Sequence, residues 1–274
     1  MGKSGNDFTV FLQWALPRMG LRREGYRKVR NQVCKRINAR LRELSLSDYW
    51  AYRGYLLAHP EEWGVLHQMM HISISRFFRD HQSWEKLRDK LLPELVAGAI
   101  RENRPLRCWS AGCASGEEPY SLALLWQKQY GKALSKPGFQ LIATDADDHL
   151  LQRARKACYP YGNVRHVPRQ WLLDSFREQD GEYCLCKATR DLVSFRKQDI
   201  REEMPEGPFD LVFCKNLVGM YFVPEIAAAL YRKIGGRMLK GGVLLLGNHE
   251  PFPIEEVPEV YEYNRGLNIY RKRE

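Results

Sequence analysis

The stretch that most constrains the fold runs from Leu106 to Ala123 and reads LRCWSAGCASGEEPYSLA. A short apolar run ends at Ala111, small residues fill Gly112–Gly116, and an apolar-periodic helix is expected over Leu122–Trp126. Short apolar runs are typical of buried strands, and glycine allows a tight turn into a helix. In α/β folds a strand, a glycine turn and a helix N-terminus in succession bring backbone close to a ligand. The sequence therefore predicts an α/β sheet with a candidate binding site at this turn.

Two carboxylates, Glu117 and Glu118, stand at the start of the expected helix. Helix N-termini after glycine turns usually hold phosphate through their free N–H groups, but two carboxylates would repel an anion. A cationic or hydroxyl-rich ligand is favoured instead, and S-adenosylmethionine, with its sulfonium, ammonium and ribose diol, fits that description. An ordinary strand–helix junction, in which both acids stabilise the helix dipole, explains the turn equally well.

Predicted strands and helices alternate after this turn. The expected strands are Phe139–Thr144, Leu192–Phe195, Phe209–Cys214, Val243–Gly247 and Asn268–Arg271, and the expected helices are Ala146–Ala157 and Pro224–Leu239. This alternation predicts a mostly parallel, doubly wound sheet, whose ligand binds at the carboxyl ends of the strands. Asp145 and Asp199 fall at such ends, and a carboxylate there can accept both protons of a ribose diol. Alternatively, Asp145 is a helix N-cap and Asp199 a surface acid.

Residues 158–191 interrupt the alternation, and we interpret them as an insertion within the sheet domain. A short helix is expected at Pro168–Phe176 and a strand at Tyr183–Cys186. The chain has 7 cysteines, an odd number without a C-x-x-C pair. We therefore expect no zinc site and no disulfide framework, but reduced thiols in a cytoplasmic protein. No apolar run is long enough to cross a bilayer, so no membrane insertion is expected.

A basic segment near the N-terminus contributes strongly to the formal net charge of +10. Its cations are Arg18, Arg22, Arg23, Arg27, Lys28, Arg30, Lys35, Arg36, Arg40 and Arg42. The apolar residues that recur there at helical spacing are Tyr26, Val29, Val33, Ile37, Leu41 and Leu44. The pattern predicts an amphipathic helix with one basic face. Such a face favours an acidic partner, namely a nucleic acid, an acidic protein helix or a membrane surface, over a merely solvated surface.

The rest of the N-terminal region predicts an all-helical domain. Ser47 or Asp48 is a candidate helix N-cap, and Pro60 is a candidate first residue of the next helix. Residues 93–105, PELVAGAIRENRP, predict the end of a helix and a linker. We therefore expect a helical domain at residues 1–92, a linker to about residue 105, and a sheet domain at residues 106–274 with the insertion at about 158–191.

Several strings of the chain resemble the chemoreceptor glutamate methyltransferases, the CheR-type family. They are FFRD at Phe77–Asp80, WSAGCASGEEPYSLAL at Trp109–Leu124, ATDAD at Ala143–Asp147, FDLVFCKNLVGMYF at Phe209–Phe222, and LKGGVLLLGNHE at Leu239–Glu250. The last is similar to the family's LKPGGxLxLGxSE segment, and the strings follow the family order over nearly the whole chain. The resemblance implies an α/β fold: a Rossmann-like, S-adenosylmethionine-dependent methyltransferase sheet domain preceded by a small all-helical N-terminal domain. It also implies methylation of glutamate side chains on cytoplasmic helices of chemoreceptors.

The resemblance implies the site residues as well. Cofactor contacts are implied at Ser73, Ser75, Arg79, Gly112, Glu118, Asp145, Asp199, Ile200, Lys215 and Asn216, with catalytic roles at Arg79 and Tyr221 and no metal. Lys215 replaces the arginine of the family's Cys-Arg-Asn string, and one extra residue separates Asn216 from Tyr221. A glutamate acceptor is ionised at neutral pH, because its unperturbed pKa is about 4.3, so no general base is required. We expect Arg79 to orient a carboxylate and Tyr221 to align the acceptor.

Other classes of function stay open at this point. The basic segment is compatible with a nucleic-acid methyltransferase, although Lys215-Asn216-Leu217 replaces the Asn/Asp-Pro-Pro-aromatic loop with which amino-methylating nucleic-acid enzymes grip a base. A small-molecule acceptor, or a non-catalytic regulatory module that only binds the cofactor, is a further alternative. The expected partners are cytoplasmic acidic helices of chemoreceptor-like proteins, bound through the basic N-terminal helix, and no nucleic acid.

Overall fold

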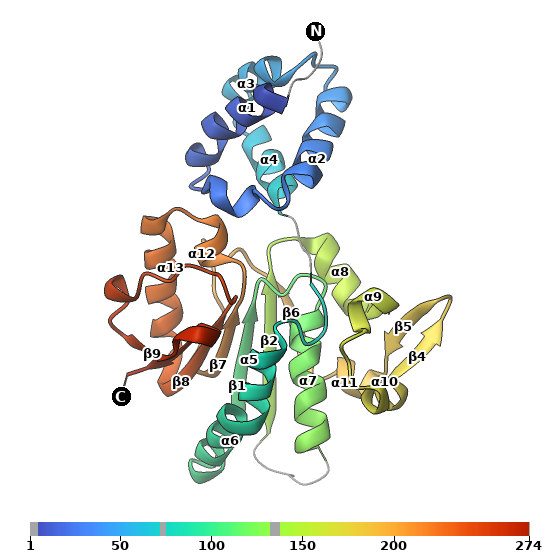
Figure 1. The fold of residues 1–274 in the computed structure, drawn as a ribbon, viewed down its shortest axis with the longest axis vertical. Coiled ribbons are helices and arrows are strands. Elements are labelled where there is room, and N and C mark those ends of the chain that lie inside the picture. Colours follow the sequence, from blue (N-terminus) through green and yellow to red (C-terminus); the bar gives the residue numbers. More distant parts are fainter. Residues whose placement is uncertain (1–4, 72–74, 132–137, 274) are drawn as a thin grey trace. The chain divides into compact units, whose positions relative to one another are not determined.

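The computed structural model describes residues 5–71, 75–131 and 138–273, and the chain forms two compact units. A helical unit comprises Met1–Ser73 and Val218–Ala227, and a sheet unit comprises Ile74–Leu217 and Ala228–Glu274 (Figure 1). Among the described helices, none combines the length and the apolar character that crossing a membrane requires.

The helical unit packs its helices around a small apolar core. The helices are α1 (Gly5–Arg18), η1 (Arg23–Tyr26), α2 (Arg30–Glu43), α3 (Tyr49–Ala58) and α4 (Glu62–Met70). The apolar stripe of α2 is buried as expected, because Val33, Ile37 and Leu41 are fully enclosed. The basic segment is not one helix, however, since α2 begins only at Arg30, after a turn and η1. Asp48 is the N-cap of α3, as its side chain accepts two backbone N–H groups.

Two arginines of the expected basic face stabilise the fold of the helical unit. Arg40 donates to both carboxylate oxygens of Glu62, at 2.9 Å and 2.7 Å, and the Tyr52 hydroxyl donates to the same carboxylate at 2.8 Å. Burial opposes ionisation of Glu62, but the hydrogen bonds from Arg40 and Tyr52 hold its pKa below the usual value. Arg36 donates to the backbone carbonyl of His71 at the end of α4. Both guanidinium groups are therefore engaged within the unit.

A segment from the C-terminal half of the chain belongs to the helical unit. It contains the short helix α12 (Val218–Tyr221) and the start of α13 (Pro224–Gly236). The Arg22 N–H donates to the carbonyl of Tyr221 at 2.8 Å. Gly25 permits close approach of the two segments, because a Cβ there would lie 2.3 Å from a backbone oxygen of α12. Residues 20–25 and residues 218–223, which are far apart in sequence, are therefore joined by backbone contacts.

The sheet unit contains a seven-stranded sheet with the order β6-β2-β1-β7-β8-β10-β9. Its strands are β1 (Leu106–Ala111), β2 (Phe139–Asp145), β6 (Val193–Lys197), β7 (Phe209–Cys214), β8 (Met238–Leu246), β9 (Val260–Asn264) and β10 (Ile269–Lys272). Neighbouring strands from β6 to β8 are parallel, and β10 pairs in antiparallel fashion with both β8 and β9. The strand order reverses between β1 and β7, where open α/β sheets bind their ligands beyond the carboxyl ends.

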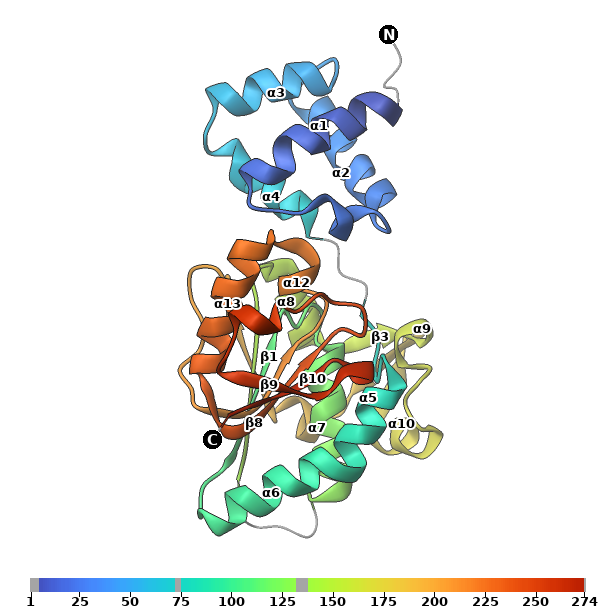
Figure 2. The same ribbon diagram turned by 60° about the vertical axis from the view of Figure 1, so that its left-hand side comes forward.

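Helices cover both faces of this sheet (Figures 1 and 2). The helices and turns of the unit outside the insertion, besides α13, are α5 (His81–Lys86), η2 (Leu87–Leu91), α6 (Leu92–Arg101), α7 (Glu117–Gln129), α8 (Asp148–Lys156), η3 (Ile254–Glu256) and η4 (Arg265–Leu267). Alternate residues of the central strands, such as Leu211 and Phe213, share one buried cluster with α5, α6 and α7. Val212, between them, is equally buried but points to the opposite face. This burial on both faces explains the uninterrupted apolar string of β7.

One long helix continues through most of residues 93–105, where the end of a helix and a linker were expected, and it ends at Arg101. α5, the π-helical turn η2 and α6 follow one another without a break (Figure 2). The Leu92 N–H bonds the carbonyl of Leu87, five residues back, and the wider π spacing accommodates Pro93 in the next turn. The division between the two units therefore falls after Ser73, and not at the expected linker.

The insertion forms a small three-stranded sheet with the order β3-β5-β4 (Figure 1). Its elements are β3 (Cys158–Pro160), α9 (Tyr161–Val164), α10 (Arg169–Ser175), β4 (Phe176–Gln179), β5 (Glu182–Leu185) and α11 (Lys187–Arg190). Cys158 and Cys184 are register partners in the antiparallel β3–β5 pair and form a disulfide. The expectation of reduced thiols is wrong for this pair, because strand pairing joins cysteines that are 26 residues apart in sequence. The described free cysteines are Cys34, Cys108, Cys113, Cys186 and Cys214.

Candidate functional site

The glycine turn after β1 holds the acid that ends β2. The Ala114 N–H donates to Asp145 Oδ2 at 2.8 Å, and the Asp147 N–H donates to Asp145 Oδ1 at 3.0 Å. Gly112 has a φ of 68°, a left-handed value that favours glycine, and a Cβ there would lie 2.8 Å from Leu217 Cδ2. The Asp145 carboxylate is thus fixed beside the turn, and each of its oxygens can accept a second hydrogen bond from a ligand.

Glu118, in the first turn of α7, presents a second carboxyl group at the same end of the sheet. Its Oε1 accepts a hydrogen bond from the Ser110 hydroxyl of β1 at 2.8 Å. Burial raises the pKa of Glu118 to about 7, against the lowering effects of the nearby Lys215 ammonium and of the Ser110 hydroxyl. A cationic ligand or a hydrogen-bond donor would favour the ionised form of this carboxyl group.

Arg79 lies on an irregular segment between Ser75 and α5. The residues on either side, Phe78 and Asp80, have φ values of 51° and 63°. Left-handed backbone at a bulky residue such as phenylalanine is strained and persists only where its surroundings enforce it. The Arg79 side chain is exposed on this constrained backbone. The segment therefore fixes the backbone of Arg79, from which the guanidinium group projects.

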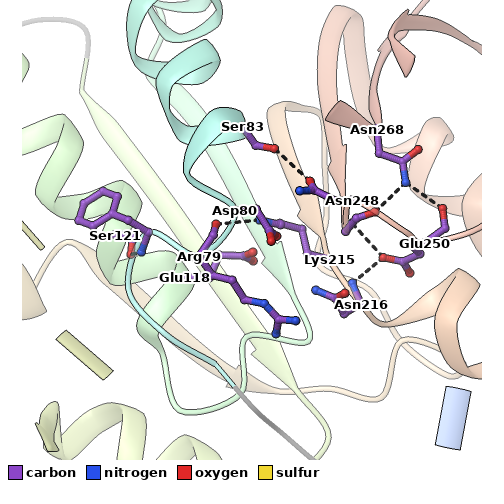
Figure 3. A network of polar contacts seen from close by, with 12 residues as sticks. Arg79, Asp80, Ser83, Glu118, Ser121, Lys215, Asn216, Asn248, Glu250 and Asn268 are labelled. Atoms are coloured by element: carbon purple, nitrogen blue, oxygen red, sulfur yellow. Dashed lines mark hydrogen bonds and ion pairs between the residues drawn. The ribbon is translucent and has the colours of Figure 1, made fainter. Parts of the chain in front are cut away.

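Lys215, the residue after β7, contacts this segment (Figure 3). Its ammonium donates to the backbone carbonyl of Arg79 at 3.3 Å and pairs with Asp80 Oδ2 at 2.8 Å. The side chain of Lys215 is only 5% exposed. Lys215 therefore holds the Arg79 segment at the end of β7. The expected role of Lys215 was a contact with the cofactor, and its contacts with Arg79 and Asp80 were not predicted.

Glu250 organises the loop after β7 and was not expected as a site residue. Its carboxylate accepts backbone N–H groups from Asn216 at 2.5 Å, from Leu217 at 3.1 Å and from Gly247 at 3.1 Å (Figure 3). Glu250 is buried, and Asn216 has a φ of 56°, a conformation that asparagine tolerates. The glutamate that ends the LGNHE string was the signal that could have identified it.

Asp199 and Ile200 follow β6, the strand beside β2. The Asp199 carboxylate accepts hydrogen bonds from Arg201, through the backbone N–H at 2.9 Å and through the guanidinium at 2.5 Å to 3.1 Å. Ile200 is buried. The expected cofactor acid at this strand end is thus already bound to a neighbouring guanidinium in the structure.

The remaining expected residues are Ser73, Ser75 and Tyr221. Ser73 lies outside the described residues, and the carbonyl of Ser75 accepts a hydrogen bond from the Asn163 side chain at 3.4 Å. Tyr221 belongs to the helical unit, where its ring packs against Tyr26 with centroids 5.2 Å apart. The structure therefore brings Arg79, Glu118, Lys215 and Asn216 together within the sheet unit (Figure 3), and it places Tyr221 in the other unit.

The fold and the site together define a class of protein. A parallel sheet with its switch point beside a glycine turn, an acid after β2 and a carboxyl group in the first turn of α7 form a Rossmann-like methyltransferase sheet domain. The chain belongs to the CheR methyltransferase family, because that family's domain, described as "CheR methyltransferase, SAM binding domain", matches residues 73–266.

Individual relatives extend the similarity beyond this domain. The chemotaxis protein methyltransferase of Listeria innocua is 32% identical over 179 residues, which are 65% of this chain and 65% of the relative, somewhat less than two thirds of its length. A probable chemotaxis protein methyltransferase of Rhizobium etli is 29% identical over 247 residues, covering 87% of this chain and 90% of the relative. Chemotaxis protein methyltransferase 2 of Vibrio cholerae is 28% identical over 275 residues, covering 97% and 92%.

The residues at the sheet edge fit S-adenosylmethionine, the ligand of the matched domain. Asp145 can accept the hydrogen bonds of a diol, and Glu118 can pair with a cationic group or accept from a hydroxyl. Gly112 has no side chain to cover the turn, so backbone is accessible there. This donor and acceptor set suits a positively charged nucleoside better than a phosphate.

Proposed function

We propose that this chain is an S-adenosylmethionine-dependent protein-glutamate O-methyltransferase that acts in the cytoplasm on chemoreceptor-like proteins. Membership of the CheR family and the names of the relatives support the methyl transfer and the link to chemotaxis. The observation that carries the choice of acceptor is the guanidinium of Arg79, presented on a strained, clamped segment at the sheet edge.

The proposed chemistry asks little of the protein beyond positioning. Bound S-adenosylmethionine supplies a methyl group that is activated by its sulfonium. The acceptor carboxylate, with an unperturbed pKa of about 4.3, is a ready nucleophile at neutral pH. Holding the two reactants in line can by itself contribute on the order of 7–11 kcal/mol to the barrier reduction.

Arg79 is the group that we assign to this positioning. A guanidinium can donate two parallel hydrogen bonds to a carboxylate, which fixes the direction of the carboxylate oxygens as well as their distance. The hydrogen bond from the Lys215 ammonium to the Arg79 carbonyl keeps the backbone of Arg79 in place. Arg79 therefore orients the acceptor carboxylate in the proposed reaction, and it is a candidate for the cofactor's carboxylate as well.

Acidic receptor helices are the partners that we propose for the helical unit. Five exposed cations of the basic segment make no ion pair within the described part of the chain, and their side chains are not engaged with backbone carbonyls as those of Arg18 and Arg36 are: Arg23, Arg27, Lys28, Lys35 and Arg42. Opposite charge raises the rate of encounter with an acidic helix. These residues, and not the engaged Arg36 and Arg40, form the proposed docking face.

The experiment that tests the function is transfer of labelled methyl groups from S-adenosylmethionine to a chemoreceptor cytoplasmic fragment. Carboxyl methyl esters release methanol in mild base, so the label on the receptor should be base-labile. Base-stable label in RNA or DNA would instead identify a nucleic-acid methyltransferase and refute the proposal. Cofactor binding without transfer to protein, nucleic acid or small molecules would identify a regulatory module and refute it as well.

A further inference from the structure

The Arg79 segment is also bound from the side of the insertion, through Asn163 of α9. The carbonyl of Asn163 accepts the backbone N–H of Phe77 at 3.0 Å, and its side-chain amide donates to the Ser75 carbonyl at 3.4 Å. Nothing in the sequence singled out Asn163. These two contacts hold the residues immediately before Arg79 against the insertion.

The same side-chain amide joins the insertion to the first turn of α7. Asn163 Nδ2 donates to Glu117 Oε1 at 2.6 Å. Glu117 is 1% exposed, and its Oε2 has no hydrogen-bond partner among the described residues. A buried carboxyl group with one unsatisfied oxygen is costly, and the hydrogen bonds that its Oε1 accepts from Asn163 and, at 3.4 Å, from the Ser115 hydroxyl help to stabilise it.

The remaining contacts of the segment come from the main sheet and its helix. The Phe78 N–H donates to the Ser121 hydroxyl at 2.9 Å, and that hydroxyl donates to the Glu117 carbonyl at 2.6 Å. Lys215 binds the Arg79 carbonyl from the end of β7. The backbone on either side of Phe78, which has left-handed φ, is thus fixed from both α7 and the insertion.

We infer that Asn163 is a positioning residue for the reaction, and that the insertion sets the orientation of the Arg79 guanidinium through the Glu117–Asn163–Ser75 link. This inference rests on the proposed function, because it assigns Asn163 an effect on transfer through Arg79. Asn163 itself touches no reacting group. Its removal would release the Ser75 carbonyl and one oxygen of a buried carboxyl group, and the strained backbone at Phe78 would relax.

The first test compares Asn163→Ala in two backgrounds. In the wild-type background, kcat for methyl transfer should fall on the order of 10-fold, because small misplacements of a positioning group are costly. In the Arg79→Lys background the same substitution should change kcat less than 2-fold, since the two residues act as one unit. Gln170→Ala is the matched control, because it removes a surface amide of the same insertion that bonds only Asp174.

A second test exchanges the donor and the acceptor of the buried pair. Asn163→Asp alone places two carboxyl groups together and should lower kcat at least as strongly as Asn163→Ala. Adding Glu117→Gln gives the buried pair one amide donor and one carboxylate acceptor again, so the free energy of unfolding should recover, but the Ser75 carbonyl still lacks its side-chain donor and kcat should stay low. Recovery of stability without recovery of kcat separates positioning through Ser75 from a general loss of folded protein, and a full return of kcat would overturn the link through Ser75.

Hydrogen exchange provides a readout that is independent of activity. Asn163→Ala should accelerate exchange of the Phe77 and Phe78 amides by 10-fold or more, while amides of β1 remain protected. Equal losses of kcat in both Arg79 backgrounds, or unchanged exchange at Phe77, would overturn the inference and leave the proposed function standing. Absence of base-labile methylation by the wild-type chain would refute the proposed function, and the exchange result would then decide the structural link alone.

Discussion

At the scale of single residues, Glu118 is the group whose titration should be visible in stability. Its folded-state pKa is raised to about 7 by burial, above the value of about 4.3 in an unfolded chain. Between these values the folded state binds more protons than the unfolded state, so this residue makes stability fall as pH rises through that window. Glu118→Gln should therefore raise the free energy of unfolding, measured by urea denaturation at pH 8, by up to about 3 kcal/mol, and the gain should vanish near pH 4.5. A gain of equal size at both pH values would contradict the assignment.

Cofactor binding should show the opposite pH dependence at the same residue. Ionised Glu118 is the form that accepts a hydroxyl proton or pairs with a cation, so the wild-type affinity for S-adenosylmethionine should increase from pH 6 to pH 8. The Glu118→Gln variant should bind more weakly at pH 8 and show a flatter pH profile in calorimetry. Asp145→Ala serves as the comparison, because it should weaken binding without removing this pH dependence.

Arg79 carries the second prediction at this scale. Arg79→Ala should reduce methyl transfer by at least 100-fold with the fold intact. Arg79→Lys should restore only part of the rate, because an ammonium group cannot reproduce the two parallel hydrogen bonds of a guanidinium. Single-turnover kinetics at saturating cofactor would measure both variants. A wild-type rate in Arg79→Lys would exclude the bidentate role, and circular dichroism would control for folding.

Sequence reasoning reached some of these residues and not others, for a physical reason. Asp145 and Glu118 stand beside strand ends and a glycine turn, which are local patterns that one stretch of sequence displays. Other contacts join residues that are distant in sequence, and only the packed chain brings them together. They are the hydrogen bonds of Lys215 to Arg79, of Glu250 to the loop after β7, and of Asn163 to Glu117. Tyr221 was assigned to the site through a matching string, its backbone contacts lie within the helical unit, and its catalytic role stays a prediction.

At the scale of elements, the β3–β5 pair makes a prediction about thiol chemistry. The disulfide between Cys158 and Cys184 leaves 5 described cysteines free. Alkylation of the denatured protein without reductant should therefore modify five thiols, and reduction beforehand should raise the number to seven. Replacing both partners by serine should destabilise the insertion by about 3 kcal/mol, because the bond closes a loop of 26 residues. Hydrogen exchange across β3 and β5 would measure this, and seven reactive thiols without reductant would contradict it.

Element boundaries show where local patterns are insufficient. The parallel strands were predicted well, because their apolar runs are buried on both faces of the sheet. The helix through Pro93 was not, since a π-helical turn accommodates the proline and has no sequence signature of its own. The basic segment was likewise assigned to one helix, whereas a turn and η1 precede α2 because the chain there pairs with α12.

At the scale of the whole molecule, the positive charge should act on encounter with the substrate. Reversing two exposed cations of the docking face, Arg27→Glu with Lys35→Glu, should raise the KM for a receptor fragment on the order of 10-fold at low salt. The affinity for S-adenosylmethionine should not change. At 0.5 M salt the difference between the variant and the wild type should nearly disappear, because exposed charges are screened beyond a few ångströms.

A matched pair of reversals on the sheet unit provides the control. Lys233→Glu with Lys240→Glu changes the net charge equally at two exposed residues of α13 and β8. An equal rise in KM for this control would show that net charge, and not the docking face, governs encounter. Arg40 is unsuitable for such an experiment, because its removal would leave the buried Glu62 carboxylate without its partner and would destabilise the helical unit.

The segment from Val218 to Ala227 makes the helical unit impossible to excise at a single cut. Any shortened chain that starts at residue 74 retains α12 but lacks Leu21 and Arg22, whose backbone pairs with Phe222 and Tyr221 in the full chain. Phe222 and Val218, both buried in the full chain, would then be exposed to water in the truncated product. Aggregation of such a truncation would report this uncovered apolar surface and say nothing about catalysis. A separable catalytic unit therefore requires a second edit, in which residues 218–227 are replaced by a short polar connection.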